Sequence, residues 1–198
     1  MSLVREFAEM RGYRGYDLIM ADPPWRFNTY SDKGLERSPE AHYKCMTLED
    51  IAAMPVPVLA ADHSVLWLWA TAPMVLQAFE VMKAWGFEYK TMGTWAKYNP
   101  ETGKRGFGTG YLMRSASEPF LIGTRGKPKT TRKARNLIVE PRREHSRKPE
   151  AGYVEAEIMM PDARRLELFS RTNRPGWDVW GNEVGKFPEA TTKGLEHA

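Results

Sequence analysis

Asp22, Pro23, Pro24 and Trp25 stand directly after the apolar run 16–21, and together they suit chemistry on a planar amino group. The amino nitrogen of adenine or cytosine is a poor nucleophile because its lone pair is delocalised into the ring. A carboxylate and a proline carbonyl can each accept one N–H of such a group, and the charge-assisted bond to the carboxylate is the stronger. The prolines fix the backbone so that a carbonyl points outward. The tryptophan offers a face for base stacking, worth about 1–3 kcal/mol.

The same four residues also have an ordinary structural interpretation. Asp-Pro-Pro commonly ends a strand and begins a turn, and Trp25 could simply pack. Their position favours the chemical interpretation, because ligands of open α/β sheets bind at the carboxyl ends of the strands. We therefore predict that the tetrapeptide lies in an active site.

Further apolar segments predict an α/β fold whose sheet is covered on both faces. Helices are expected from Thr47, whose spacing to Asp50 resembles a capping box, from Pro73 to Gly86, and from Pro149 to Met160. Strands that alternate with helices indicate βαβ units and a mainly parallel sheet. The expected strands are residues 16–21, 64–69, 87–97, 119–122, 164–169 and 177–180.

Length and composition narrow the class of protein. The 198 residues predict one domain, residues 1–187, followed by a polar tail, residues 188–198. A single cysteine excludes an internal disulfide and suits a reducing compartment. No apolar stretch approaches the about 20 residues of a membrane span. We therefore expect a cytoplasmic protein with no membrane partner.

Positive charge is concentrated in residues 125–148. This segment holds ten Lys or Arg and two acidic residues, a local charge of +8, whereas the whole chain carries +4. The rest of the chain is therefore net acidic, and a specific anionic surface is the expected partner. Arg132, Lys133 and Arg135 are candidates for binding a phosphate backbone. The alternative is a solvated basic loop.

Other patterns argue against some kinds of site. Gly106-Phe107-Gly108-Thr109-Gly110 resembles a glycine-rich cofactor turn, but such a turn follows a strand and begins a helix. Here a polar segment precedes it, so we expect a loop over residues 99–110. The four histidines show no metal-ligand spacing, and one cysteine cannot complete a zinc set. We expect neither a metal site nor covalent catalysis.

The chain resembles the MT-A70 family of adenine methyltransferases, which includes messenger-RNA methylases and bacterial and phage DNA methylases. The resemblance covers nearly the whole chain, and its last two blocks are highly specific. A chain this close to a bare catalytic domain is most similar to the bacterial and phage members. The blocks that carry the resemblance are residues 21–25, 43–47, 110–111, 118–123, 145–150, 166–171 and 176–183.

The resemblance implies a Rossmann-like sheet that binds S-adenosylmethionine. Asp22 and the Pro23 carbonyl would hold the target amino group, with Trp25 and Tyr43 lining the base pocket. Pro24 completes the motif, and Asp22 also belongs to the expected cofactor site. The acidic cofactor contact that relatives often carry before this motif has no identified counterpart here.

The resemblance also implies cofactor contacts late in the chain. Glu167 would accept hydrogen bonds from the ribose hydroxyls, and Arg171 and Asn173 would face the sugar and the tail of the cofactor. Asn182 and Glu183 would frame its adenine. Where some relatives have a lysine for the cofactor carboxylate, this sequence has Ser117, so another basic residue would take that role.

The implied reaction is methyl transfer to the 6-amino group of adenine in nucleic acid, with DNA favoured over RNA. One alternative is methylation of a protein glutamine, for which a similar Asn-Pro-Pro-aromatic motif is used. Those enzymes have a glycine-rich cofactor loop before that motif, and nothing similar precedes Asp22. A second alternative is a catalytically silent nucleic-acid-binding subunit, against which the intact tetrapeptide argues. The sequence leaves a homodimer or heterodimer open.

Overall fold

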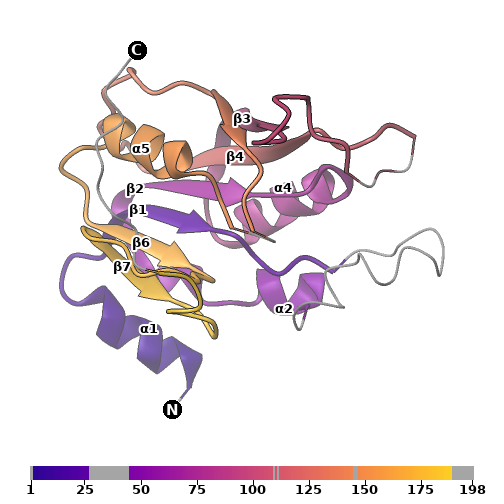
Figure 1. Ribbon diagram of the computed structural model, residues 1–198. Coiled ribbons are helices and arrows are strands. Elements are labelled where there is room, and N and C mark those ends of the chain that lie inside the picture. The colour runs from indigo at the N-terminus through magenta and orange to yellow at the C-terminus, as the bar shows by residue number, and fades with distance from the viewer. Residues whose placement is uncertain (1, 27–44, 109, 111, 145–146, 189–198) are drawn as a thin grey trace.

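The computed structural model of the protein describes residues 2–26, 45–108, 110, 112–144 and 147–188. It contains a seven-stranded sheet of order β5-β3-β4-β2-β1-β6-β7 (Figure 1). Six of these strands run parallel to one another, whereas β4 is antiparallel to both of its neighbours. The expected α/β class with a mainly parallel sheet is therefore confirmed. The strands are β1 (Tyr16–Ala21), β2 (Ala60–Trp69), β3 (Glu88–Tyr98), β4 (Ser117–Arg125), β5 (Leu137–Pro141), β6 (Arg165–Leu168) and β7 (Trp177–Trp180).

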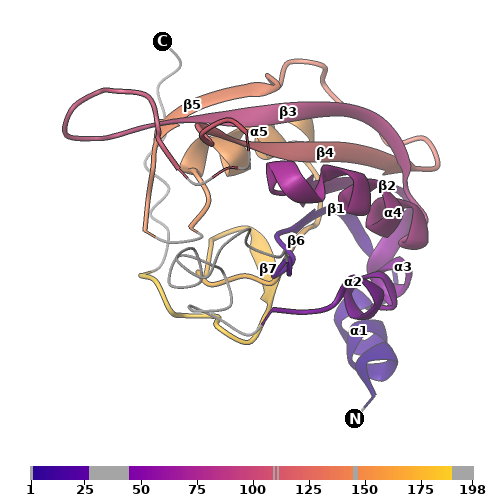
Figure 2. The same cartoon turned by 90° about the vertical axis from the view of Figure 1, so that its right-hand side faces the viewer.

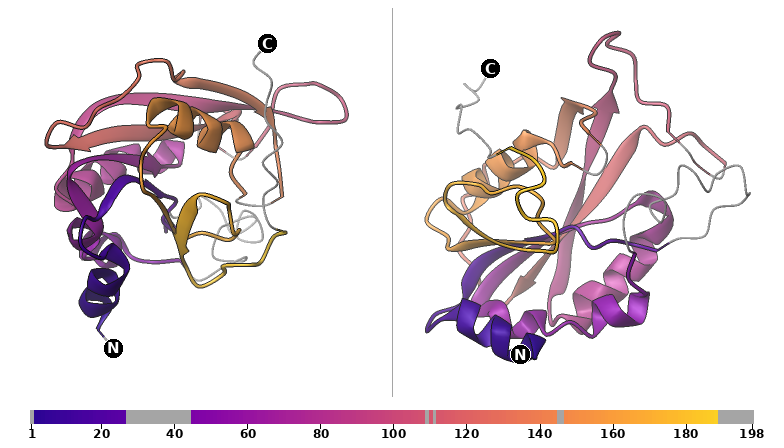
Figure 3. Two further views of the ribbon diagram at one scale, coloured as in Figure 1. Left: turned by 90° about the vertical axis from the view of Figure 1, so that its left-hand side faces the viewer. Right: turned by 60° about the horizontal axis from the view of Figure 1, so that its bottom comes forward.

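The sheet is curled, and helices cover both of its faces. The helix α5 (Glu150–Met159) lies inside the curl, between β3 and β4 on one side and β6 and β7 on the other (Figure 2). The other helices lie on the outer face, and Figure 3 shows the same two layers from further directions. Among the described residues, no helix is both long enough and apolar enough to cross a membrane. The outer helices are α1 (Leu3–Arg11), α2 (Leu48–Ala52), α3 (Val56–Leu59) and α4 (Val75–Ala84), the last preceded by a 3-10 turn, Ala72–Met74.

The central strand β1 explains why its sequence is apolar without interruption. Successive strand side chains point to opposite faces, so Leu18 and Met20 pack on the α5 side while Ile19 and Ala21 pack under the outer helices. All four side chains are buried. Each is therefore a core residue, and the run cannot show the alternation of a half-exposed strand.

Some elements differ from the sequence prediction. Strand β5 lies within the basic stretch 125–148, whose sequence indicated a loop. The strand has little hydrophobic signal, because Ile138 is buried whereas Leu137 and Val139 are exposed. Helix α1 was not anticipated; the hydroxyl of Ser2 caps it and accepts a hydrogen bond from the Arg5 N–H. The expected cap at Thr47 is confirmed, since its hydroxyl accepts from the Asp50 N–H at 3.1 Å.

The direction of the strands defines one functional edge of the sheet. The six parallel strands all end there, and we call it the carboxyl edge. Because β4 runs in the opposite direction, its first residues also lie at this edge, where Glu118 pairs with Trp95 of β3. The carboxyl edge therefore collects side chains from strand ends, from the start of β4 and from the loops that follow.

Candidate active site

Asp22 follows the last residue of β1 and lies at the middle of the carboxyl edge. Its backbone N–H points to the Leu168 carbonyl at the end of β6, 3.5 Å away. The two prolines then form a tight turn, in which the Pro23 carbonyl accepts from the Trp25 N–H at 2.8 Å and the Pro24 carbonyl accepts from the Met46 N–H at 3.0 Å. A carbonyl oxygen has two lone pairs, so the Pro23 carbonyl keeps one for a further donor.

The structure corrects the expected role of Trp25. Its side chain is 3% exposed and packs in the core under the outer helices. Its indole N–H donates to the Trp69 carbonyl at 3.0 Å, at the end of β2. A ring enclosed in this way offers no open face to a base, so the structural interpretation of this residue holds. Tyr43, the other expected base contact, lies outside the described residues.

A buried ion-pair network holds the Asp22 carboxylate. The Lys148 ammonium lies 2.6 Å from Asp22 Oδ2 and 2.7 Å from Glu118 Oε1. The second oxygen of Glu118 lies 2.6 Å from the Lys97 ammonium. The Lys148 side chain is only 7% exposed, so these charges are largely removed from water. Four segments that are far apart in sequence thus share one alternating chain of two cations and two anions.

The network sets the protonation of its members. Burial raises the pKa of Asp22 above its usual range, and the Lys148 ammonium offsets part of this effect. Burial alone would also raise the pKa of Glu118, but Lys148 and Lys97 together lower it to about 2. Burial alone would lower the pKa of Lys148, yet Asp22 and Glu118 outweigh it and raise that pKa. Glu118 and Lys148 are therefore held in their charged forms, and Lys148 also favours the charged form of Asp22 against the effect of burial.

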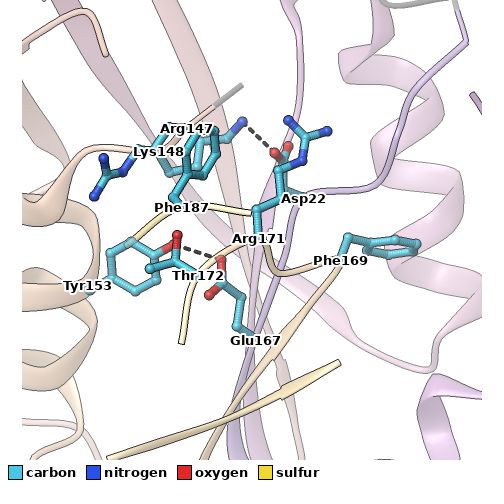
Figure 4. Close-up of a pocket in the computed structure, with 9 residues that line it drawn as sticks. All are labelled: Asp22, Arg147, Lys148, Tyr153, Glu167, Phe169, Arg171, Thr172 and Phe187. Atoms are coloured by element: carbon cyan, nitrogen blue, oxygen red, sulfur yellow. Dashed lines mark hydrogen bonds and ion pairs between the residues drawn. The ribbon is translucent and has the colours of Figure 1, made fainter. Parts of the chain in front are cut away.

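A pocket that is open to solvent lies beside this network (Figure 4). It is formed by the ends of β1 and β6, by the start of α5 and by the chain that follows β6. Its lining combines carboxylates, cations and aromatic rings: Asp22, Arg147, Lys148, Tyr153, Glu167, Phe169, Arg171, Thr172 and Phe187.

Glu167 contributes a buried carboxylate to the floor of this pocket. Its oxygens accept hydrogen bonds from the Tyr153 hydroxyl at 2.6 Å and from the Ser170 hydroxyl at 2.8 Å. Burial raises the pKa of Glu167, although these two hydrogen bonds oppose the effect. The side chain is fixed by its neighbours from α5 and from the turn after β6, and each oxygen keeps lone pairs for a ligand.

The chain after β6 shapes the opposite wall. Phe169 has a φ of 63°, a left-handed conformation that is uncommon for a residue with a side chain. Such strained residues are concentrated at binding sites. Arg171 then forms an ion pair with Glu183 at 2.8 Å, and its carbonyl accepts from the Phe187 N–H at 3.1 Å. These contacts tie the end of the described chain to the pocket.

The structure brings together only some of the expected site residues. Asp22, Glu167 and Arg171 line the pocket, and Glu183 reaches it through its ion pair with Arg171. Three expected cofactor contacts are exposed and lie outside the lining: Ser117, Asn173 and Asn182.

Lys148 and Glu118 are the main residues that the sequence did not single out. Both stand inside blocks that carried the family resemblance, 145–150 and 118–123. Glu118 follows Ser117 directly, so the alternation of a strand places Glu118 inward and Ser117 outward. Lys148 was counted among the charges of a basic loop, although its partner Asp22 lies 126 positions earlier.

Arg132, Lys133 and Arg135 do not line the pocket either. Their segment passes the last turn of α5, where the Thr131 hydroxyl donates to the Ile158 carbonyl at 2.6 Å. The pocket lies at the other end of this helix, next to its first residues. These three cations therefore cannot touch a base held at Asp22, and their expected binding to a phosphate backbone stays a prediction.

The side chains that line the pocket suit, in their chemistry, the cofactor that the resemblance implies. S-adenosylmethionine combines a carboxylate, an ammonium, a sulfonium, a ribose diol and an adenine ring. Lys148, Arg147 and Arg171 are suitable for the carboxylate, Glu167 for the diol, and the aromatic side chains for the adenine. Among the described residues, no group of three or more His, Cys, Asp or Glu side chains could hold a metal ion.

Comparison with known proteins identifies several relatives of this chain. A relative described as "Type II methyltransferase M.MunI", from Mycoplasma sp, is 33% identical over 190 residues, which cover 85% of this chain and 78% of the relative. The human "N(6)-adenine-specific methyltransferase METTL4" is 32% identical over 188 residues, covering 87% of this chain and 38% of its own length. The human "N(6)-adenosine-methyltransferase catalytic subunit METTL3" is 29% identical over 178 residues, which cover 85% of this chain and 28% of the relative.

The chain thus spans most of the Mycoplasma relative and well under half of each human one. The model of the MT-A70 family matches residues 16–183, from the first residue of β1 to the partner of Arg171. The resemblance seen in the sequence and the enzyme class expected from it are confirmed: the chain belongs to the MT-A70 family.

Proposed function

We propose that this protein transfers a methyl group from S-adenosylmethionine to the 6-amino group of adenine in nucleic acid, and that its substrate is DNA. The observation that carries the proposal is the Asp22 carboxylate at the mouth of a polar pocket, held by a buried lysine. The relative with the most complete coverage among those described, M.MunI, is named as a type II methyltransferase, and this supports DNA.

The side chains around Asp22 suit acceptance of an amino group. An ionised carboxylate is an acceptor only, so both of its oxygens can receive N–H bonds. Lys148 occupies Oδ2 and favours the ionised form against the effect of burial. The amino group of adenine would donate to Asp22 and to the remaining lone pair of the Pro23 carbonyl. These bonds would favour a more pyramidal nitrogen whose lone pair is localised. Positioning of the amino group against the methyl donor would supply most of the rate enhancement.

The rest of the pocket is suited to orienting the cofactor. When bound, S-adenosylmethionine supplies an electrophilic methyl group on a positively charged sulfur. Glu167, fixed by Tyr153 and Ser170, would receive the ribose hydroxyls, and Lys148 or Arg171 would receive the carboxylate. The transfer would need no covalent bond between enzyme and substrate: the methyl group would pass to the amino nitrogen, the sulfur would leave as a neutral thioether, and the nitrogen would lose its proton afterwards. A target in duplex DNA has to be flipped out first, at a cost of a few kcal/mol.

Methylation of defined nucleic acids tests the proposal. The protein is incubated with S-adenosylmethionine and either DNA or RNA of mixed sequence, and the nucleosides are then analysed by mass spectrometry. N6-methyladenine in DNA, absent with the Asp22→Ala variant, is the expected result. Methylation in RNA alone would correct the substrate, and methylated cytosine or protein glutamine would refute the proposed target. Cofactor binding without methylation of any substrate would indicate the silent-subunit alternative.

A further inference from the structure

Five exposed cations form a patch on the connection between β4 and β5. We call them the remote basic patch: Lys127, Lys129, Arg132, Lys133 and Arg135. They occupy nine consecutive positions without one acidic residue. Arg125, just before them, is excluded because its guanidinium donates to the Pro57 carbonyl at 3.0 Å.

The cations near the pocket differ from those of the remote basic patch in their ion pairing. Near the pocket, each cation with a described partner is matched by a carboxylate: Lys97 with Glu118, Arg143 and Arg174 with Glu150, Arg147 with Glu144, Lys148 with Asp22, and Arg171 with Glu183. Within the described part of the chain, no member of the remote basic patch has an ion-pair partner. The basic stretch 125–148 therefore consists of two parts. Among its described residues, three of the four cations in the second part are ion-paired, with Arg142 the exception, whereas the first part holds five exposed cations without an ion pair.

The backbone of the patch is held in place although its side chains are exposed. The Lys127 N–H donates to His63 Nδ1 at 3.2 Å, at the start of the sheet. The Thr131 hydroxyl is bound to the Ile158 carbonyl, and the Arg135 N–H donates to Glu155 Oε2 at 2.6 Å. The segment is thus fastened to β2 and α5 at three points. A fastened backbone with outward-pointing charges loses less conformational entropy on binding than a loose loop.

Helix α5 gives the distance between the patch and the pocket. Glu150 begins the helix beside the pocket and Ile158 lies eight residues later. At 1.5 Å per residue, the two ends are about 12 Å apart along the helix axis. One step of duplex DNA is about 3.4 Å, so this distance corresponds to about four base pairs. Nucleic acid with its target adenine in the pocket can therefore reach the patch through its flanking backbone.

We propose that the remote basic patch binds the phosphate backbone of nucleic acid that flanks the target, several nucleotides away from the reacting base. This inference rests on the proposed nucleic-acid substrate. Five cations spread along a surface, without an enclosing pocket, fit an extended polyanion rather than one small anion. Binding there displaces counterions, and so the contribution depends on salt and not on base sequence.

The test compares two DNA lengths and two variants with the same charge change. The patch variant is Arg132→Gln, Lys133→Gln and Arg135→Gln together. The control variant is Arg5→Gln, Lys83→Gln and Lys90→Gln, three exposed cations on the outer helices α1 and α4 and at the start of β3. Affinity is measured by fluorescence anisotropy at several salt concentrations, with circular dichroism to confirm folding. The ligands are a hairpin duplex of about 5 base pairs with its target adenine at the centre, which ends short of the four-base-pair reach, and a duplex of about 24 base pairs, which extends beyond it.

The expected result depends on length. On the long duplex, the patch variant should reduce the slope of log affinity against log salt by about 0.9 for each phosphate that is no longer neutralised, or about 2.7 in all. The hairpin should lose far less, and the control variant should keep the parent slope on both ligands. The proposal is overturned by an unchanged slope on the long duplex, by equal losses on both ligands, or by equal losses in the control. If the parent methylates no nucleic acid at all, the proposed function fails separately, because these binding measurements require no catalysis.

Discussion

Lys148 offers the sharpest test of the electrostatic description of the site, and it needs no cofactor or substrate. Replacing Lys148 with methionine keeps an unbranched side chain, shorter by one atom, and removes the charge. At an effective dielectric constant of about 20, two unit charges 2.6 Å apart interact by about 6 kcal/mol. Part of this is offset by desolvation, and removing one partner of a buried pair typically costs about 3–5 kcal/mol. For a domain of this size, that loss lowers Tm by about 6–20 °C.

The pH dependence of this loss identifies its cause. Burial already raises the pKa of Asp22, and removal of Lys148 raises it further. A carboxyl whose pKa is higher in the folded than in the unfolded state stabilises the fold in acid, and that stability disappears as pH rises through the folded-state pKa. The deficit of Lys148→Met relative to the parent should therefore be largest near neutral pH and shrink in acid.

A double variant separates the effect of charge from that of packing. Lys148→Met leaves Asp22 without its cation, while Glu118 keeps Lys97. Adding Asp22→Asn removes the carboxylate that has lost its partner, so part of the lost stability should return. Urea denaturation followed by circular dichroism, at a series of pH values, measures all three proteins. The reasoning is refuted if Lys148→Met costs under about 1 kcal/mol, a value typical of surface pairs. It is also refuted if the cost does not vary with pH, or if the double variant is as unstable as the single one.

Three further results are expected. Asp22→Ala should lower methyl transfer more than tenfold, equivalent to about 1.4 kcal/mol, with cofactor affinity nearly unchanged; retained activity would exclude this role for Asp22. Glu167→Ala should weaken S-adenosylmethionine binding in calorimetric titration, since hydrogen bonds to a charged group contribute about 1.5–3 kcal/mol each. Ser117→Ala, exposed and outside the pocket, is its control, and an equal dissociation constant for both variants would assign Glu167 a structural role. The ionised Glu118 carboxylate contributes stability that is fully present above its usual pKa of 4.5 and is lost as pH falls towards about 2. Denaturation at a series of pH values should show that Glu118→Gln lacks this acid-dependent part, and identical pH profiles for parent and variant would contradict it.

The sequence was most informative where one local property decides the structure. Strand β1 was predicted correctly because a run that is buried on both faces has to be apolar throughout. Strand β5 was missed because it has one buried residue, Ile138, within a stretch dominated by charge. Short edge strands carry little hydrophobic signal of their own, and their pairing supplies the rest.

In the site, the sequence located the residues at strand ends but not those that a long-range contact defines. Asp22 and Glu167 follow or end strands, so topology alone places them at the carboxyl edge. Lys148 could not be distinguished from its basic neighbours, because what sets it apart is a contact with a residue 126 positions away. Trp25 was misjudged for the same reason: an aromatic ring beside an active site looks identical in sequence whether it faces the ligand or the core.

The buried Trp25 explains why the last residue of the tetrapeptide carries an indole. Its N–H reaches across to the Trp69 carbonyl at the end of β2. Phenylalanine has the ring but no donor, and leaving that buried carbonyl unsatisfied costs about 1–3 kcal/mol. Tyrosine carries its donor at the tip of the ring and would direct it elsewhere. The tryptophan therefore joins the turn after β1 to the end of β2 through this hydrogen bond. The contact fixes the direction of Asp22, three residues earlier. The indole at the fourth position of the tetrapeptide therefore serves alignment, and this role does not depend on the substrate that the site takes.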